Sequence, residues 1–416
     1  MSRLTRRRLL ALATQAAAAL TAHAYASPFA HGHGKSSIEP PDITGPASLK
    51  AHAASSGLLF GCAVAPGLLD PASPRYDPAY TALIREQASI LVAENVMKWG
   101  PLRPTPTTYN FDPADALVAF AERNRMKIRG HNLCWHRQLP TWFASVATPA
   151  NARALLVAHI ETVAGRYAGR MHSWDVVNEA IEPKDGRPDG LRISPWLKLA
   201  GPDYIELAFH TARRADPQAL LTYNDYGIEN ETPEAAAKRA AVLLLLRRLR
   251  ARRVPIDAVG IQSHIAAAPS PTSSDPKFTY GPGLLRFLAD LRELDLQVFL
   301  TEMDVNDRAL PPALPDRDRA VAETYQRYLS AVLTDPAVKA VLTWGITDRY
   351  TWLNGEDARA DKLPERPLPF DSGASRDSAD SHSPADPIPY RAKPAFFSLR
   401  ESLDPLTPSN PKRPSL

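Results

Sequence analysis

The sequence has few cysteines, no excess of charge beyond its first residues, and no long apolar run past them. Only Cys62 and Cys134 are present among 416 residues, which excludes a scaffold held together by several disulfides. Both cysteines lie in apolar, strand-like stretches, so we expect two buried free thiols rather than a bridge.

The balance of charge excludes a large class of partners. Lysine and arginine number 49 against 45 acidic residues, and four of the arginines stand within the first 26 residues, which contain no acid. Without that segment the chain is formally neutral. A neutral chain does not offer the basic surface that a phosphate backbone requires, so we expect no nucleic-acid partner.

The first 26 residues have the pattern of an export signal. Arg6 and Arg7 precede an apolar, alanine-rich run, and Ala24-Tyr25-Ala26 provides small residues suited to cleavage. The paired arginines resemble a twin-arginine signal, and an ordinary secretory signal is the alternative. We therefore expect a secreted or periplasmic protein that does not contact the membrane after the signal is removed.

The remaining chain divides by composition. Residues 27–50 are rich in Ala, His, Gly, Ser and Pro and predict a flexible leader, and residues 404–416 predict a proline-rich tail. Between them, residues 51–403 predict one domain, with a low-complexity insert near 372–386. We expect this domain to act as a monomer.

Within the domain, short apolar runs alternate with longer amphipathic segments. Helical periodicity covers 112–125, 151–167, 202–215, 233–252, 283–294 and 317–333. The predicted strands are Leu58–Val64, Ser89–Glu94, Lys127–Leu133, His172–Asn178, Ala219–Asn224, Ala258–Ser263, Gln297–Glu302 and Lys339–Gly345. Eight such units predict an α/β fold of the closed (β/α)₈ barrel type, and an open doubly wound sheet is the alternative.

Two of these strands end in a carboxylate. The apolar run that begins at Trp174 ends in Asn178-Glu179, and the run that begins at Val298 ends in Thr301-Glu302. In a barrel the carboxyl ends of all strands meet at one face, where the chemistry collects. Cleavage of a glycosidic bond needs one carboxyl group to protonate the leaving oxygen and a second to meet the anomeric carbon. The pattern therefore predicts a paired-carboxylate site.

Other polar residues and several tryptophans follow the strand ends. Trp135, Trp344 and Trp352 fall in loops beside them, where a flat apolar ring can cover the face of a sugar. The other tryptophans are more typical of a packed core. Together these residues predict an open polar cleft for a ligand rich in hydroxyl groups.

The motifs resemble glycoside hydrolase family 10. They are Ala93–Trp99, Arg129–His131, Trp135–Pro140, Trp174–Glu179, Asn224–Tyr226, Gln262–His264, Thr301–Asp304 and Trp344–Ile346. The resemblance extends from about residue 55 to 402. It implies a retaining endo-1,4-β-xylanase on a (β/α)₈ barrel, acting on xylan and xylo-oligosaccharides without a cofactor or metal. Cys134 and the insert depart from the family pattern.

The resemblance also implies a role for each motif residue. Glu179 is similar to the family's general acid/base and Glu302 to its nucleophile; His264 with Asp304 would orient Glu302, and Asn178 would bind the sugar 2-hydroxyl. The predicted substrate-binding residues are Glu94, Asn95, Lys98, His131, Trp135 and Gln138 on the glycone side, Gln262, Trp344 and Trp352 around the reactive ring, and Tyr226 towards the aglycone.

Three other functions fit parts of the pattern. The same machinery could act on cellulose or mixed-linkage glucan, since xylose differs from glucose by one hydroxymethyl group. A non-catalytic polysaccharide-binding barrel would keep the aromatic residues but lose a carboxylate. A metal site at His131, His136 and His264 is disfavoured because the neighbouring side chains are Asn and Gln, which ligate transition metals poorly.

Overall fold

The computed structural model describes residues 42–355, 358–373 and 390–405. The predicted export signal lies outside the described residues, as do most of the predicted leader, insert and tail. The structure therefore describes only the last residues of the predicted leader and the first residues of the predicted insert and tail.

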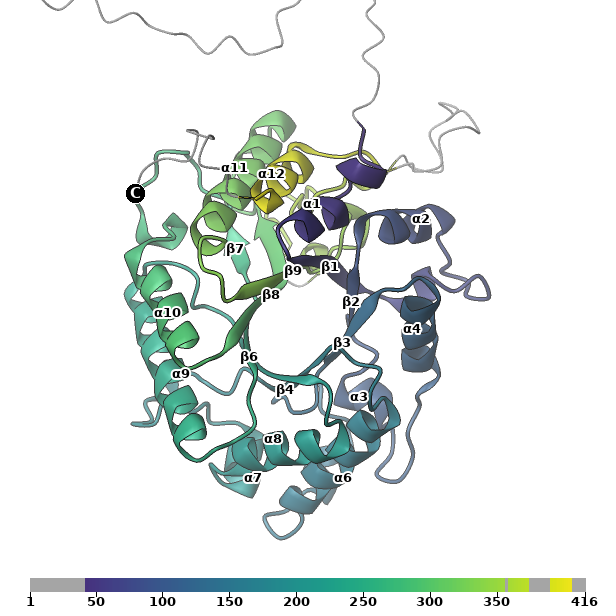
Figure 1. Ribbon diagram of the computed structural model, residues 1–416, viewed down its shortest axis with the longest axis vertical. Coiled ribbons are helices and arrows are strands. Elements are labelled where there is room, and N and C mark those ends of the chain that lie inside the picture. Colours follow the sequence, from purple (N-terminus) through teal and green to yellow (C-terminus); the bar gives the residue numbers. More distant parts are fainter. Residues whose placement is uncertain (1–41, 356–357, 374–389, 406–416) are drawn as a thin grey trace, which may run out of the picture. The chain divides into compact units, whose positions relative to one another are not determined.

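Eight parallel strands close into a barrel (Figure 1). They are β1 (Leu59–Val64), β2 (Ile90–Ala93), β3 (Lys127–His131), β4 (Ser173–Asn178), β5 (Leu220–Asp225), β6 (Ala258–Ile261), β8 (Gln297–Asn306) and β9 (Val338–Thr343). Each strand pairs with the next in this order, and β9 pairs with β1 to complete the ring. The prediction of a (β/α)₈ barrel is confirmed, and each of the eight predicted strands corresponds to one of these.

Helices surround the ring in Figure 1. They are α1 (Leu49–Ser55), α2 (Pro78–Gln87), α3 (Trp99–Leu102), α4 (Asp112–Arg123), α5 (Phe143–Val146), α6 (Ala152–Arg166), α7 (Pro195–Ala200), α8 (Tyr204–Ala215), α9 (Pro233–Ala251), α10 (Pro282–Glu293), α11 (Leu314–Val332) and α12 (Pro394–Leu403). Short 3₁₀ turns are η1 (Gly45–Ala47), η2 (Pro66–Leu68), η3 (Pro183–Asp185), η4 (Pro276–Phe278), η5 (Asp348–Tyr350) and η6 (Trp352–Asn354). Several helices begin with a capping side chain followed by proline. Before α9, for example, the Thr232 hydroxyl accepts the N–H of Ala235, and Pro233 is the first residue of the helix.

The strands are apolar because the barrel buries both of their faces. Ile90 and Val92 of β2 point into the barrel, where they pack with Phe299 and Leu342. Leu91, between them, belongs to the separate layer that lies between strands and helices. This alternation follows from the two-residue period of a strand, and it leaves only the strand ends free to carry polar groups.

The predicted leader is wrong at its C-terminal end. Helix α1 begins at Leu49, before the predicted start of the domain at residue 51, and the side chain of Leu49 is fully buried. Gln87 of α2 accepts the Leu49 N–H at 3.0 Å and donates to the carbonyl of Ile43 at 2.8 Å. These contacts hold Ile43 and Leu49 against α2, although the composition around them resembles that of a linker.

The edges of β6 and β8 also differ from the prediction. Strand β6 ends at Ile261 rather than Ser263, and β8 runs four residues past Glu302 to Asn306. The additional length of β8 pairs with a short strand that was not predicted, β7 (His264–Ala266), in the register His264 to Asp304. These paired residues lie 40 positions apart in the chain, so no local sequence pattern predicts that they pair.

Cys62 and Cys134 are both buried and free, as predicted. Burial raises the pKa of each thiol far above its usual range. Among the residues that the structure describes, no helix combines the length and apolar character needed to span a bilayer.

Candidate active site

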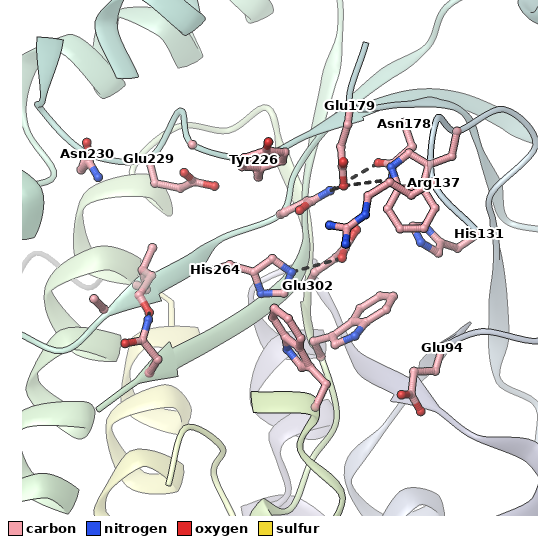
Figure 2. Close-up of a pocket in the computed structure, with 18 of the residues that line it drawn as sticks. Glu94, His131, Arg137, Asn178, Glu179, Tyr226, Glu229, Asn230, His264 and Glu302 are labelled. Carbon is pink, nitrogen blue, oxygen red and sulfur yellow. Dashed lines mark hydrogen bonds and ion pairs between the residues drawn. The ribbon is translucent and has the colours of Figure 1, made fainter. Parts of the chain in front are cut away.

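A cleft of about 1200 Å³ opens at the C-terminal ends of the barrel strands (Figure 2). Its walls include all but one of the predicted site residues: Glu94, Asn95, Lys98, His131, Trp135, Gln138, Asn178, Glu179, Tyr226, Gln262, His264, Glu302, Trp344 and Trp352. The exception, Asp304, lies behind His264. Residues spread over some 260 positions of the chain therefore meet in one site.

Glu179 stands directly after β4, in a left-handed backbone conformation with φ of 58°. Its N–H donates to the Asn224 carbonyl at 2.8 Å, and its own carbonyl accepts from Arg192 Nε at 2.8 Å. Left-handed backbone is costly for a residue other than glycine, so these bonds hold a strained turn. The turn directs a carboxyl group that is only 8% exposed into the cleft.

The carboxyl group of Glu179 is held by amides. Gln262 Nε2 donates to its Oε1 at 3.0 Å and Asn178 Nδ2 donates to the same oxygen at 3.3 Å. Its Oε2 lies 3.9 Å from Nδ1 of His136, and burial with the nearby charges of Arg192 and Arg137 lowers the pKa of His136 to about 4. His136 is therefore neutral near neutral pH, and within the described part of the chain no lysine or arginine forms an ion pair with this carboxyl group.

Glu302 lies in β8, where the register with β9 shifts between Leu300 and Met303. Asn224 Nδ2 donates to its Oε1 at 2.7 Å, and His264 Nε2 lies 3.3 Å from its Oε2. Burial alone would raise the pKa of Glu302, but the His264 hydrogen bond, the electrostatic effect of His131 and the Asn224 bond lower it to about 2. Glu302 is therefore a carboxylate at any ordinary pH.

His264 bridges two carboxylates. Its Nδ1 lies 2.9 Å from Asp304 Oδ1, while its Nε2 faces Glu302. Burial would lower the pKa of His264, but Asp304 and Glu302 raise it well above its usual value. An imidazolium has two N–H groups and can donate to both partners at once. Asp304 also accepts the indole N–H of Trp352 at 2.8 Å, which anchors that ring at the rim of the cleft.

Asn224 connects the two carboxyl groups. Because a carboxylate only accepts, the Asn224 nitrogen faces Glu302, and the same nitrogen lies 2.9 Å from Oδ1 of Asn178. The opposite orientation of the Asn178 amide would bring two amide nitrogens to 2.9 Å, so its oxygen faces Asn224 and its nitrogen faces Glu179. A chain of hydrogen bonds thus runs from Glu302 to Glu179.

The wall of the cleft formed by the loops after β2 and β3 carries a buried lysine. Lys98 Nζ donates to Asn95 at 2.9 Å and lies over the rings of Trp135 and Trp344, at 5.1 and 5.6 Å. Burial lowers the pKa of Lys98, and burial raises the pKa of Glu94 nearby. This wall combines a cation, an acid and aromatic faces, which suits a polyhydroxylated ring.

His131 is supported from inside the barrel. Its Nδ1 lies 2.9 Å from Asp175 Oδ2, and Asp175 is itself paired with the buried Arg129. Asp175 therefore lies behind the cleft rather than in its lining. Trp174, Trp99 and Trp196 are almost fully buried, as expected for core tryptophans.

Several functional positions were missed. Asn224 appeared in a motif, yet only the tertiary structure shows its bond to Glu302. The other cleft residues that the sequence did not assign are His136, Arg137, Arg192, Gly227, Glu229, Asn230, Ile265, Ala266, Ala267, Lys277, Phe278, Asn306, Arg308 and Ala309. Most of them lie in loops, where the period of a strand or helix gives no signal.

Replacing Gly260 with alanine should disable the site without touching a carboxylate. A Cβ at Gly260 would lie 2.1 Å from Asn224 Oδ1 and 2.9 Å from Thr301 Cγ2, so Asn224 would have to leave Glu302. Loss of a hydrogen bond to a charged group corresponds to about 10- to 100-fold in kcat/KM. Gly165→Ala is the control, because its Cβ would meet nothing within 4 Å. A Gly260→Ala enzyme within twofold of wild type would contradict the prediction.

Fold and site together define the class of this protein. The mouth of a parallel (β/α)₈ barrel carries two carboxyl groups. Glu302 is a carboxylate with a pKa of about 2, and Glu179 accepts hydrogen bonds from side-chain amides. Hydrogen bonds through Asn224 and Asn178 connect the two groups. Two such carboxyl groups in one open polar cleft are the machinery of a glycoside hydrolase.

Comparison with known proteins identifies the family. Residues 48–381 match the profile of Glycosyl hydrolase family 10, and the chain belongs to this family. Endo-1,4-beta-xylanase B of Thermotoga neapolitana is 35% identical over 328 residues, which cover 78% of this chain and 83% of that protein. Native xylanase 10B from Thermotoga maritima superposes with a TM-score of 0.71 at 33% identity, covering 86% of this chain and 98% of the other. Xylanase 10B from Thermotoga petrophila RKU-1, solved in complex with xylobiose, also gives 0.71, at 32% identity and 86% and 97% coverage.

Proposed function

We propose that this protein is a retaining endo-1,4-β-xylanase that hydrolyses internal bonds of xylan. The single observation that carries the proposal is the contrast between the two carboxyl groups. Glu302 is held ionised by His264 and Asn224, whereas Glu179 is held by amides and pairs with no lysine or arginine among the described residues. Glu302 is thus prepared to attack as an anion, which leaves the proton transfers to Glu179.

In the first step, Glu302 attacks the anomeric carbon while Glu179 gives its proton to the glycosidic oxygen. The bond from the anomeric carbon to that oxygen breaks, and a covalent glycosyl ester of Glu302 forms. The His264 imidazolium, fixed by Asp304, keeps Glu302 oriented and anionic before the attack. Asn178, beside Glu179, is placed to bind the 2-hydroxyl of the same sugar, a contact that strengthens in the transition state.

In the second step, Glu179 removes a proton from water, and the water oxygen displaces Glu302 from the anomeric carbon. Two inversions give net retention. Glu94, Asn95, Lys98, His131, Trp135 and Gln138 hold the chain on the glycone side. Gln262, Trp344 and Trp352 surround the reactive ring, and Tyr226 lies towards the aglycone.

Product analysis by NMR on xylan and xylo-oligosaccharides tests this function. The expected result is release of new reducing ends from internal positions, with the β-anomer of each product appearing first. An α-anomer appearing first would overturn the mechanism. Binding of xylan with no release of reducing ends would show a polysaccharide-binding barrel instead.

Substrate preference is tested with chromogenic xylobioside and cellobioside. Glucose carries a hydroxymethyl group that xylose lacks, so the space around Gln138, Trp344 and Trp352 decides between them. Trp344 is nearly buried at 8% exposure, and its neighbours Lys98 and His131 leave it little freedom to move. We expect a higher kcat/KM on the xylobioside; equal or higher kcat/KM on the cellobioside would assign the same chemistry to a glucan.

We further propose that the enzyme is exported by a twin-arginine signal within residues 1–26 and acts outside the cytoplasm as a monomer. The support is the sequence pattern of Arg6-Arg7, the apolar run and Ala24-Tyr25-Ala26. The N-terminal sequence of the exported protein tests where the signal is cleaved. Loss of export after Arg6→Lys with Arg7→Lys would support the twin-arginine signal, and retained export would favour an ordinary secretory signal. Gel filtration of the mature chain tests the oligomeric state.

A further inference from the structure

Glu229 is a third buried carboxyl group at the cleft, and neither proposed step uses it. It lies in the loop after β5 and is 2% exposed (Figure 2). Its Oε1 accepts the N–H of Ser263 at 3.0 Å, and its Oε2 accepts the N–H of Ile228 at 2.7 Å. Both oxygens are therefore engaged with backbone, which does not suit a group that must exchange a proton with substrate.

The partner of Glu229, Ser263, has a backbone conformation that its side chain does not favour. Its φ is 64°, in the left-handed region, which is unfavourable for a residue other than glycine. Its hydroxyl contacts Tyr328 Oη at 2.8 Å and donates to the Ile261 carbonyl at 3.1 Å, so the side chain points away from the cleft. The unusual turn separates β6, which ends at Ile261, from β7, which begins at His264.

The residues on either side of Ser263 contact the two catalytic carboxyl groups. Gln262 donates to Glu179 at 3.0 Å, and His264 lies 3.3 Å from Glu302. The backbone of Gln262 is fixed as well, because its N–H donates to the Asp225 carbonyl and its carbonyl accepts from the Glu302 N–H. Ser263 joins these two residues, so a change in its backbone conformation would alter how Gln262 and His264 are directed relative to each other.

We propose that Glu229 is a positioning residue of this hydrolase, whose carboxylate holds the left-handed turn at Ser263 by accepting its N–H. This turn directs Gln262 to the acid/base and His264 to the nucleophile. Because these catalytic roles are those of the proposed function, the inference rests on it. Without the carboxylate, a buried N–H would lose its partner, at a cost of about 1–3 kcal/mol, and Ser263 would relax towards negative φ.

The experiment compares Glu229→Ala and Glu229→Gln with wild type on an aryl xylobioside at pH 4 and pH 6. We expect kcat/KM of Glu229→Ala to fall by about 10- to 100-fold at pH 6, the effect of about 1–3 kcal/mol. Glutamine retains an oxygen that can accept the Ser263 N–H, so Glu229→Gln should lose less.

The ratio of activities at the two pH values separates positioning from general damage. The charged or titratable groups that act on Glu302 include His264, His131 and Lys98, and Glu179 and Arg137 line the same cleft. If His264 moves away, the pKa of Glu302 rises from about 2 towards its ordinary value of 4.5, and activity at pH 4 falls by up to about fourfold more than in wild type. A merely structural role would reduce activity equally at both pH values.

Glu231→Ala is the matched control. Glu231 lies two residues away and also accepts backbone N–H groups, but those of Gly281, Gly283 and Leu284 at the start of α10. We expect this variant to melt at a lower temperature with an unchanged activity ratio.

Ser263→Gly provides the rescue, because glycine adopts positive φ without strain. In the Glu229→Ala background it should restore part of the lost activity and return the pH ratio towards that of wild type. A folded Glu229→Ala enzyme within twofold of wild type, or an equal loss at both pH values that Ser263→Gly does not relieve, would overturn the inference. If Glu229→Ala does not fold, Glu229→Gln decides, because its amide nitrogen would replace one of the two oxygens that accept backbone N–H groups: a larger loss at pH 4 than at pH 6 supports the inference, and an equal loss or none overturns it. Absence of wild-type activity on the xylobioside would instead reject the proposed function.

Discussion

Glu302→Ala should lower kcat/KM on xylan by about 10⁴-fold or more, because the variant has no group to form the glycosyl ester. Glu302 is 5% exposed and its pKa is about 2, so wild type presents an ionised nucleophile throughout the usual assay range. Glu302→Gln should be equally inactive, since it keeps the volume and loses only the charge. Release of reducing ends from xylan measures both variants.

Azide provides the decisive control for Glu302. In Glu302→Ala the space left by the carboxylate can admit azide, which attacks the anomeric carbon from the same side. Activity on an aryl xylobioside should recover with added azide, and the product should be the α-glycosyl azide, with inverted configuration. A loss of less than about tenfold in Glu302→Ala would contradict its assignment as nucleophile, since covalent catalysis supplies far more than that.

Glu179→Ala should show a loss that depends on the leaving group. On xylan, where the departing sugar oxygen needs a proton, we expect kcat/KM to fall by about 10²- to 10⁴-fold. On a dinitrophenyl xylobioside, whose leaving group departs as an anion, kcat/KM should stay within about tenfold of wild type. Steady-state assays on the two substrates measure this contrast.

The second step distinguishes Glu179 further. Without a base to activate water, the glycosyl ester on Glu302 should accumulate, so kcat on the activated substrate falls and an initial burst of phenolate appears. Added azide should restore turnover and give the β-glycosyl azide, with retained configuration. An equal loss of kcat/KM on both substrates would show that Glu179 acts in binding or folding rather than as the acid/base.

Much of the fold could be predicted because each strand of the barrel has a recognisable local pattern in the sequence. A strand buried on both faces must be apolar along its length, and a strand that delivers a catalytic group must end in a polar residue. In β4 the run is apolar apart from Asp175, which is paired with the buried Arg129, and its predicted and observed C-terminal ends agree at Asn178, directly before Glu179. The same reasoning located Glu302, but not the end of its strand, because β8 continues as a partner for β7.

Other features have no local signal because they depend on residues far apart in the chain. Helix α1 could not be predicted from its composition, since the side chain that binds it, Gln87, lies 38 residues away. Likewise, the bond between Asn224 and Glu302 spans 78 residues, and it requires the absence of a side chain at Gly260. Arg192 lies in a loop, and a loop has no periodic pattern from which its place in the site could be predicted.

The amino-acid sequence alone was sufficient to predict the barrel, its strand order along the chain and the two acids, Glu179 directly after β4 and Glu302 within β8, because each depends on neighbouring residues. Only the tertiary structure determines how those acids differ. The low pKa of Glu302 comes from His264 and Asn224, and the amide environment of Glu179 comes from Gln262 and Asn178, across strands that meet only when the ring closes. Electrostatic interactions and hydrogen bonds act through space over a few ångströms, so distance along the chain carries no information about them.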